Sequence, residues 1–258
     1  MKKESIDFIV NWLNEYSQKS GTNGFVVGVS GGIDSALTAN LCVRTNKKCI
    51  LVNLPIRQNP LEVDRAKELI HYLADKFSNV EYAEVNLTGI FETIEKDFPS
   101  SIQDPLSMAN TRSRLRMTTL YAFAGHHKLL VAGTGNKVED FGIGFFTKYG
   151  DGGVDISPIA DLMKSEVYQL AEMLDVPQSI LKAAPTDGLF HDGRSDEDQI
   201  GATYNELEWA MKFELNKSSE ENLNLRQKQV LEIFRSRHKA NTHKMIPIPV
   251  CILPENLR

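Results

Sequence analysis

The segment Gly28-Val29-Ser30-Gly31-Gly32-Ile33-Asp34-Ser35 constrains the fold of this chain more than any other stretch of the sequence. It follows the apolar run Phe25-Val26-Val27, which has the hydrophobic character of a buried parallel strand, and it precedes residues 35–41, which can begin a helix. Two consecutive glycines let the backbone approach an anion closely, and the free N–H groups at the start of the helix face the same anion. We therefore predict that strand, loop and helix converge on a pyrophosphate group.

Asp34 and the two serines favour a pyrophosphate site over an ordinary strand-to-helix turn. Ser, Gly and Asp are also good turn and N-cap residues, so a bare Gly-Gly pair is better interpreted as an ordinary strand-to-helix turn. Here Ser30 and Ser35 add hydroxyl donors, and Asp34 offers a carboxylate to a metal on the same phosphates. The string is not a Walker A loop, because no Gly-Lys-Ser/Thr follows, and it is not the dinucleotide fingerprint Gly-x-Gly-x-x-Gly.

Hydrophobic periodicity predicts strands that alternate with helices along most of the chain. The expected strands lie at 25–29, 49–54, 80–85 and 129–132. The expected helices lie near 6–13, 35–41, 66–77, 108–125, 203–215 and 222–238, and a further helix is expected to begin at Lys164. This order is typical of an α/β fold with an open, doubly wound, mainly parallel sheet and helices on both faces, in which ligands bind at the carboxyl ends of the strands. The connections 86–107 and 185–199 lack periodicity, and we interpret them as functional or disordered loops.

The composition excludes several classes of protein. A net charge of -5 argues against a nucleic-acid partner, since a phosphate backbone requires a basic surface. No apolar run approaches the roughly 18 residues that span a membrane, and the N-terminus lacks a signal-peptide core, so we expect a cytoplasmic protein with no membrane contact. Cys42, Cys49 and Cys251 have neither metal-site nor disulfide spacing, and we expect all three to be reduced and structural. One domain, 1–258, suffices for this length.

Five strings, in the expected order, are similar to those of one enzyme family. They lie at 30–35, 110–117, 133–139, 145–155 and 242–244. The chain resembles, over nearly its whole length, the ammonia-dependent branch of the NAD synthetase family within the ATP pyrophosphatases. The resemblance implies a Rossmann-like fold of the adenine-nucleotide alpha hydrolase type. It also implies a ligase of NAD biosynthesis, which uses ATP to adenylate the nicotinate carboxylate of deamido-NAD, releases pyrophosphate, and lets ammonia displace AMP to form NAD.

The same resemblance assigns ligands to individual residues. The implied ATP contacts are Gly28, Val29, Ser30, Gly31, Gly32, Ile33, Asp34, Ser35, Thr134, Lys164 and Thr186. The implied ligands of Mg²⁺ are the carboxylates of Asp34 and Glu139, because this ion usually keeps water and phosphate oxygens as its other ligands. The implied deamido-NAD contacts are Arg114, Lys148, Asp155, His243 and Lys244, and the neighbouring Phe145 and Phe146 are candidates to stack on the nicotinate ring.

Asp34, Lys164 and Asp151 are the predicted catalytic residues. Lys164 opens an expected helix, where the helix dipole disfavours a cation, and a bound phosphate would resolve that conflict. At that place it would stabilise the charge that develops on the α-phosphate during adenyl transfer. Asp151 is the candidate to take a proton from the incoming ammonium ion. Asp34 acts through the metal.

Arg112, Arg114 and Arg116 alternate at a spacing of two residues, so on a helix they point to different faces and cannot all serve one ligand. The family pattern selects Arg114, and for the other two arginines we expect ordinary surface pairing. Asp187 lies where the family pattern is not kept, and it receives no role.

The source of nitrogen and the partner are further implications of the resemblance. Glutamine-using relatives carry an extra amidohydrolase region with a nucleophilic cysteine, and the sequence leaves no room for such a glutaminase domain, so we expect free ammonia as the donor. The family also implies a homodimer.

Two other functions fit part of the pattern. Another enzyme of the superfamily, such as a tRNA thiolase, would require a basic surface and paired cysteines, and the sequence has neither. A nucleotide-binding sensor that holds ATP without turnover would lack the metal carboxylates or Lys164, and all three residues are present.

Overall fold

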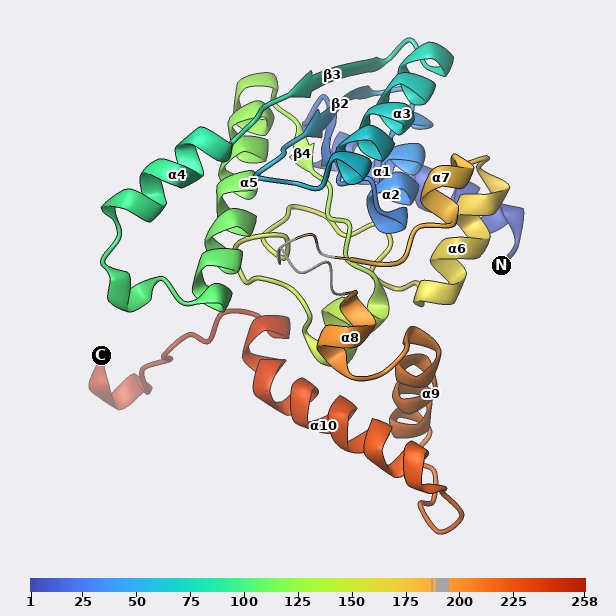
Figure 1. Cartoon of the computed structure of the whole chain (residues 1–258), viewed down its shortest axis with the longest axis vertical. Coiled ribbons are helices and arrows are strands. Elements are labelled where there is room, and N and C mark those ends of the chain that lie inside the picture. Colours follow the sequence, from blue (N-terminus) through green and yellow to red (C-terminus); the bar gives the residue numbers. More distant parts are fainter. Residues whose placement is uncertain (187, 189–194) are drawn as a thin grey trace.

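The central sheet holds four parallel strands among the residues that the structure describes, in the order β3-β2-β1-β4 (Figure 1). The structure is a computed structural model and describes residues 1–186, 188 and 195–258. The strands are β1 (Gly24–Gly28), β2 (Lys48–Asn53), β3 (Val80–Glu84) and β4 (Leu130–Val131). β1 pairs with both β2 and β4, so that Phe25 lies opposite Cys49 on one side and Leu130 on the other. The predicted parallel sheet is confirmed, and its inner strand β1 leads into the glycine loop.

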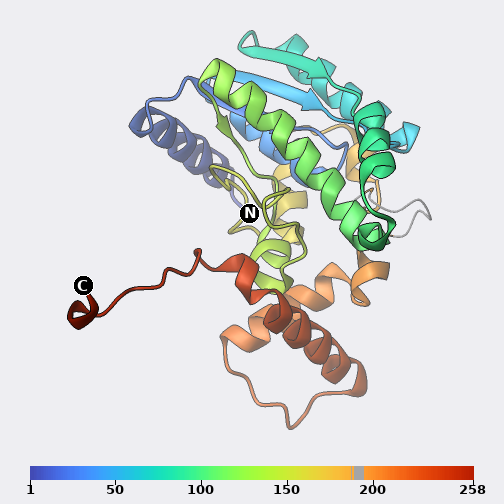
Figure 2. The ribbon, with the colours of Figure 1, turned by 90° about the vertical axis from the view of Figure 1, so that its left-hand side faces the viewer.

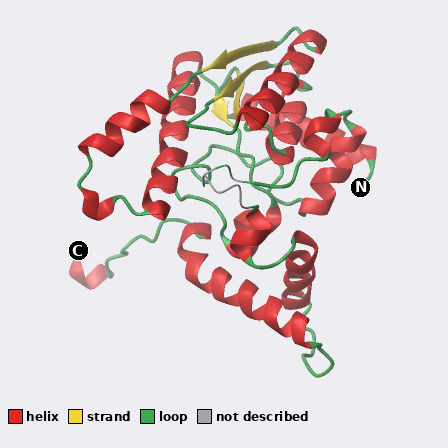
Figure 3. Ribbon diagram, in the orientation of Figure 1, coloured by secondary structure: helices red, strands yellow, loops and turns green. Residues whose placement is uncertain are grey.

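Helices surround this sheet (Figure 3). Those before β4 are α1 (Lys3–Lys19), α2 (Ile33–Val43), α3 (Pro60–Lys76), α4 (Thr88–Asp97) and α5 (Pro105–His127). Those after β4 are α6 (Lys164–Met173), α7 (Gln178–Leu181), α8 (Asp196–Ile200), α9 (Tyr204–Leu215) and α10 (Leu225–Met245), and a π-helix at Val138–Ile143 precedes them. Short 3-10 turns occupy Ser100–Ile102 and Glu255–Leu257.

The side chains of β1 alternate between two hydrophobic clusters, because successive residues of a strand point to opposite faces. Phe25 and Val27 pack with residues of α1, α2, α3 and α6, whereas Val26 packs with residues of α4 and α5. Both faces of the sheet are therefore covered, as the doubly wound prediction requires.

A third hydrophobic cluster lies apart from the sheet and is made by α9, α10 and the π-helix. Leu207, Val230 and Phe234 are among its buried residues, and they pack around Val138 and Ile143. The π-helix follows β4 closely along the chain, so this cluster holds α9 and α10 beyond the end of that strand (Figure 1).

The prediction of an irregular connection at 86–107 is wrong, because α4 and a 3-10 turn lie within it. Phe91 is the one residue that α4 buries, so the helix leaves little periodic signal in the sequence. The similar prediction for 185–199 is only partly addressed, since 187 and 189–194 lie outside the described residues. In the remainder, Ser195 caps α8 with a capping box, so the segment ends in a helix.

The last helix is longer than predicted, and it is followed by an extended tail. α10 runs to Met245, so His243 and Lys244 belong to its last turn. Residues 246–258 then leave the body of the molecule (Figure 2). Cys251 is exposed in this tail, which contradicts its predicted structural role, whereas Cys42 and Cys49 are buried. Within the described residues, none of the helices combines the length and apolar character that a membrane crossing requires.

Candidate active site

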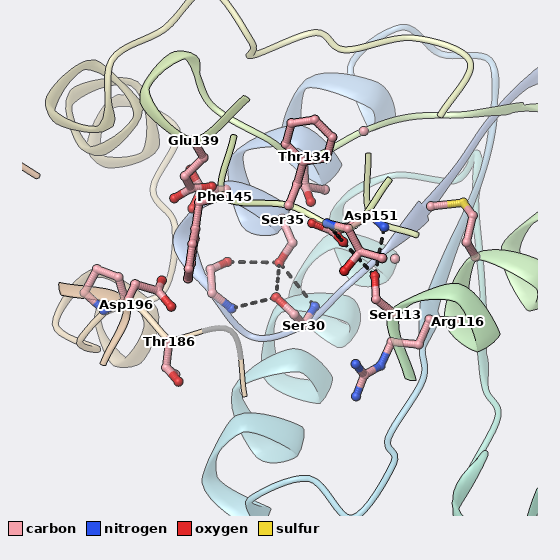
Figure 4. A pocket seen from close by; sticks show the side chains of 18 of the residues that line it. Ser30, Ser35, Ser113, Arg116, Thr134, Glu139, Phe145, Asp151, Thr186 and Asp196 are labelled. Atoms are coloured by element: carbon pink, nitrogen blue, oxygen red, sulfur yellow. Dashed lines mark hydrogen bonds between the residues drawn. The ribbon is translucent and has the colours of Figure 1, made fainter. Parts of the chain in front are cut away.

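The loop between β1 and α2 is held in shape by its own serines. The hydroxyl groups of Ser30 and Ser35 lie 3.1 Å apart, and Ser35 Oγ also donates to the carbonyl oxygen of Gly32 at 3.0 Å (Figure 4). Gly31 adopts a φ of +84°, and a Cβ there would lie 2.4 Å from the carbonyl oxygen of Glu62. Gly32 is the N-cap of α2 and offers no side chain to the first turn, so N–H groups at this helix start remain available to an anion.

A cavity of about 760 Å³ opens at this loop. Figure 4 shows Ser30 and Ser35 in its middle, with Glu139 on one side and Asp151 beside Ser113 on the other. The predicted site residues that line the cavity are Gly28, Val29, Ser30, Gly32, Ile33, Asp34, Ser35, Arg114, Thr134, Glu139, Lys148, Asp151, Lys164, Thr186, His243 and Lys244. All of the predicted ATP contacts except Gly31, and all of the predicted deamido-NAD contacts except Asp155, thus line one chamber.

Lys164 lies between the two carboxylates that were predicted to bind a metal. Its Nζ is 2.5 Å from Asp34 Oδ2 and 3.1 Å from Glu139 Oε1, and the lysine is only 3% exposed. Burial by itself would lower the pKa of Lys164, but the two carboxylates outweigh it and raise that pKa above its ordinary value. Burial raises the pKa of Asp34, and the lysine offsets part of this rise. The structure therefore places a cation where the carboxylates of Asp34 and Glu139 converge.

These oxygen donors suit a divalent cation such as Mg²⁺. Within the described residues no group of three or more His, Cys, Asp or Glu side chains is placed to hold a metal ion, so a metal at the predicted pair Asp34 and Glu139 would need substrate and water as further ligands. Mg²⁺ commonly binds through one or two carboxylates together with substrate phosphates and water. The pair and the adjoining anion loop fit that ion.

Tyr204 and Asn136 support the carboxylates, and sequence reasoning missed both. Tyr204 Oη donates to Glu139 Oε1 at 2.5 Å, and Asn136 Nδ2 donates to Asp34 Oδ1 at 3.1 Å. The ammonium of Lys164 also lies 4.5 Å from the centre of the Tyr204 ring. The capping box of Thr203 with Glu206 is visible in the sequence and places Tyr204 at the start of α9. Nothing in that signal indicates that its hydroxyl reaches a residue 65 positions earlier.

Four predicted deamido-NAD contacts form one hydrogen-bonded wall of the cavity. Arg114 Nε donates to the carbonyl oxygen of Lys148 at 3.2 Å, and Lys148 Nζ donates to that of His243 at 2.7 Å. Lys244 Nζ donates to the carbonyl oxygens of Gly144 and Phe146, and burial lowers its pKa. α5, the loop after the π-helix and the end of α10 thus join on a basic surface.

Asp151 is held between α5 and its own loop. Its Oδ1 accepts hydrogen bonds from Ser113 Oγ at 2.6 Å and from the N–H of Thr147 at 3.0 Å. Gly150 lets the loop approach α5, because a Cβ there would lie 2.2 Å from Ser113 Oγ. Burial raises the pKa of Asp151, which makes the carboxylate a better proton acceptor than an exposed one.

Asp155 is the predicted deamido-NAD contact that the structure does not bring into the cavity. Its Oδ2 accepts a hydrogen bond from the N–H of Val131 at 2.8 Å, and its Oδ1 accepts one from Tyr121 Oη at 3.0 Å. It borders a smaller hollow instead, together with Trp12, Tyr16 and Phe141. Its role toward a dinucleotide stays a prediction.

The expectation of surface pairing for Arg112 and Arg116 is wrong. Arg112 is buried, with its guanidinium 5.4 Å from the centre of the Phe91 ring. Arg116 lines the cavity and donates to the carbonyl oxygen of Leu54 and to Gln58 Oε1. The two-residue spacing correctly places the three arginines on different faces of α5. It does not predict that each of these faces contacts another part of the chain.

Asp140, which follows Glu139 in the chain, leads to a prediction about how the stability of the protein depends on pH. Burial and the charges of Glu139, Asp151 and Asp34 raise the pKa of Asp140 from 3.8 to about 8. The folded state therefore keeps the proton of Asp140 over a pH range in which the unfolded state has released it, which begins near pH 4. The contribution of this proton to the free energy of unfolding is full below that pH and is lost as the pH rises to about 8. We expect Asp140→Asn to be more stable than the wild type at pH 8 and to gain roughly 4 kcal/mol over it between pH 5 and pH 8, since each unit of pKa shift is worth about 1.4 kcal/mol.

Denaturant unfolding at both pH values, in buffer that contains a chelator, measures the effect. Asp161→Asn is the control, because that carboxylate is 95% exposed. Parallel pH dependence of the wild type and Asp140→Asn would contradict the prediction.

Residues 5–247 match the model of a protein family described as NAD synthase. Two curated relatives are named NH(3)-dependent NAD(+) synthetase. The one from Mycoplasma genitalium is 39% identical over 90% of this chain and 90% of its own, and the one from Alkaliphilus metalliredigens is 43% identical over 77% of this chain and 82% of its own. The solved structure titled NMN synthetase, from Francisella tularensis, has a TM-score of 0.83 and 34% identity and covers 98% of both chains.

Proposed function

The chain belongs to the NAD synthase family, and from this premise we propose that it is an ammonia-dependent ligase that converts deamido-NAD to NAD at the expense of ATP. One observation carries the proposal. The pyrophosphate loop and the basic wall made by Arg114, Lys148, His243 and Lys244 line the same cavity, so a nucleoside triphosphate and an anionic acceptor can meet there.

The reaction has two steps, and the residues of the cavity position and stabilise the reacting groups in each. In the first step a nicotinate carboxylate oxygen attacks the α-phosphorus of ATP, and the bond to pyrophosphate breaks. Ser30, Ser35 and the N–H groups at the start of α2 hold the leaving pyrophosphate. Lys164 supplies positive charge beside it. The product of this step is a nicotinate adenylate.

In the second step ammonia attacks the activated carbonyl carbon, and the bond to AMP breaks. The nitrogen must lose protons on the way to the amide. Asp151 lies in the same cavity with a raised pKa, and we assign it to accept one of them. Asp34 and Glu139 would hold Mg²⁺, whose charge neutralises phosphate oxygens when it is bound. No covalent bond to the protein is needed in either step.

The test is a reaction of the purified protein with ATP, Mg²⁺, deamido-NAD and an ammonium salt. Chromatography should show AMP, pyrophosphate and NAD in equal amounts, and omission of the ammonium salt should stop NAD formation. Absence of all three products under these conditions would exclude the proposed ligase activity.

A mononucleotide acceptor is a second candidate, and two observations favour it. The structure from Francisella tularensis that covers 98% of both chains is titled NMN synthetase, and the expected dinucleotide contact Asp155 lies outside the cavity. Nicotinate mononucleotide carries the same carboxylate, so the two steps are unchanged. Comparing kcat/KM for the mononucleotide and for deamido-NAD decides between the acceptors.

We propose that residues 1–258 act as one catalytic domain. The cavity is lined by residues from Gly28 to Lys244, and these come from elements of all three hydrophobic clusters. Separation of the chain into independent parts would therefore divide the cavity.

We also propose that the protein is a homodimer, in which each tail docks on the other copy. The apolar side chains of the tail are between 47 and 80% exposed at Ile246, Ile248, Val250, Ile252, Leu253 and Leu257. A segment that stays disordered is usually poor in such residues, whereas burial against a second copy would remove them from water. The tail also follows directly on His243 and Lys244, which line the cavity.

The triple substitution Ile248→Ser, Val250→Ser and Ile252→Ser should raise the dissociation constant of the dimer at least about tenfold, because three aliphatic side chains would lose their burial. Size-exclusion chromatography with light scattering over a range of concentrations measures this. Glu255→Gln is the control in the same tail. A wild type that stays monomeric at micromolar concentration would contradict the prediction.

A further inference from the structure

The leaving pyrophosphate carries several negative charges, and much of the cationic charge around the cavity is already engaged. Lys164 pairs with both Asp34 and Glu139, and Arg116 donates to the carbonyl oxygen of Leu54 and to Gln58. Arg114, Lys148 and Lys244 belong to the basic wall on which the acceptor is expected to bind, and they donate to carbonyl groups there. A further cation beside the loop would complete the charge balance of the phosphates.

α3 brings such a cation to the loop. Its first turns pack so closely on the loop that only glycine fits at position 31, where a Cβ would lie 2.4 Å from the carbonyl oxygen of Glu62 and 3.3 Å from the Cβ of Arg65. Arg65 Nε donates to the carbonyl oxygen of Gly31 at 3.2 Å. Arg65 also lines the cavity, together with Ser30 and Gly32 of the loop.

The guanidinium of Arg65 keeps part of its hydrogen-bonding capacity. Its Nε is fixed at Gly31, and among the described residues no hydrogen bond or ion pair is formed by its two terminal nitrogens. The guanidinium is planar, so anchoring Nε holds the terminal nitrogens close to the same loop. An arginine fork of this kind matches the oxygens of a phosphate group and binds them more strongly than neutral donors do.

We propose that Arg65 binds the terminal phosphates of ATP and the pyrophosphate that leaves. This proposal rests on the proposed function, since it assumes that the loop holds the β- and γ-phosphates. Arg65 is then a catalytic residue, because it touches the leaving group as the bond to the α-phosphorus breaks. Arg65 has several charged neighbours along α3, including Asp64 and Lys67, so the sequence pattern does not distinguish it from a solvated arginine.

The experiment compares inorganic pyrophosphate with AMP as ligands of the protein with Mg²⁺. AMP lacks the two terminal phosphates, so Arg65→Gln should weaken pyrophosphate binding about 10- to 100-fold, the loss of one or two charge-assisted hydrogen bonds, and leave AMP binding within about twofold. Calorimetry measures both affinities without turnover. In kinetic assays the KM for ATP should rise, while the KM for the acceptor stays constant.

Two other variants distinguish an arginine that binds phosphate from one that only holds the backbone of Gly31 in position. Glutamine at position 65 keeps an N–H donor that can reach the Gly31 carbonyl but carries no charge, whereas Arg65→Lys keeps the charge and should recover part of the pyrophosphate affinity. Lys67→Gln is the matched control, because Lys67 is on the same helix and pairs with Glu84 on the surface at 3.0 Å. It loses the same charge away from the cavity.

Wild-type affinity for pyrophosphate in Arg65→Gln would overturn the proposal, and so would an equal loss in Lys67→Gln. An equal loss of AMP affinity in Arg65→Gln would also overturn it, because a general collapse of the loop affects both ligands. These affinities are measured on the free protein, so they test Arg65 even when no NAD is formed, and the two failures can be distinguished.

Discussion

Asp34→Ala is expected to lower the rate of AMP and NAD formation by about a thousandfold or more while the protein stays folded. Asp34 is one of the two carboxylates available for Mg²⁺, and it also fixes Lys164 at the start of α6 through a 2.5 Å contact. Its loss therefore removes a metal ligand and misplaces the cation that stabilises the transferring phosphate. Initial rates of AMP formation at saturating ATP and acceptor measure the loss.

The fold should survive this change because Lys164 keeps two neighbours. Its ammonium remains 3.1 Å from Glu139 and above the ring of Tyr204. Burial raises the pKa of Asp34, and the ammonium of Lys164 offsets part of this rise. Thermal unfolding should shift by only a few degrees, and Asp161→Ala at the surface should retain full activity. An active Asp34→Ala enzyme would remove Asp34 from the metal site and from catalysis.

Lys164→Met is expected to lower activity about 100- to 1000-fold and also to destabilise the protein by about 3–5 kcal/mol, which is typical when one partner of a buried ion pair is removed. The methionine fills a similar volume but leaves Asp34 and Glu139 facing each other without a cation. Denaturant unfolding in a chelating buffer measures the loss of stability, and initial rates measure the loss of activity.

The two effects of this substitution should respond differently to Mg²⁺. A divalent cation that binds the folded state between the carboxylates should restore much of the stability, because binding to the native state alone shifts the unfolding equilibrium. It should not restore activity, since the contact with the phosphate is missing. Lys137→Met, which breaks the exposed ion pair with Asp161, is the control. Equal stability of Lys164→Met and the wild type without Mg²⁺ would contradict the assigned role of Lys164.

The sheet and the anion loop could be predicted because their signals are local. Short strand-like runs of four to six residues, separated by helical periodicity, predict parallel strands, and the glycine string follows one of them directly. α4 was missed for a related reason, since a helix that buries only Phe91 carries almost no periodic signal. The end of α10 was placed too early, because its last turn is polar and basic.

The candidate site likewise has a part that the sequence predicts and a part that only the structure shows. Ser30, Asp34 and Ser35 lie in one continuous string, and the family resemblance adds Glu139, Lys164 and the basic residues around the acceptor. Neither source predicts that Lys164 joins Asp34 and Glu139 in one ion-pair cluster, that Tyr204 supports Glu139, or that Arg65 reaches Gly31. These contacts join residues that are 25 to 130 positions apart, so no spacing in the sequence records them.

The parallel α/β architecture, the glycine loop after β1 and the family could be predicted from residue order alone, because each depends on residue types in short, ordered strings. Packing in three dimensions sets which cations have a charged partner: Lys164 lies against two carboxylates, whereas Lys148, Lys244 and Arg65 donate to neutral carbonyl groups. Electrostatic interactions and burial depend on distances in space, and those distances are set by how α3, α6, α9 and α10 are arranged around the cavity.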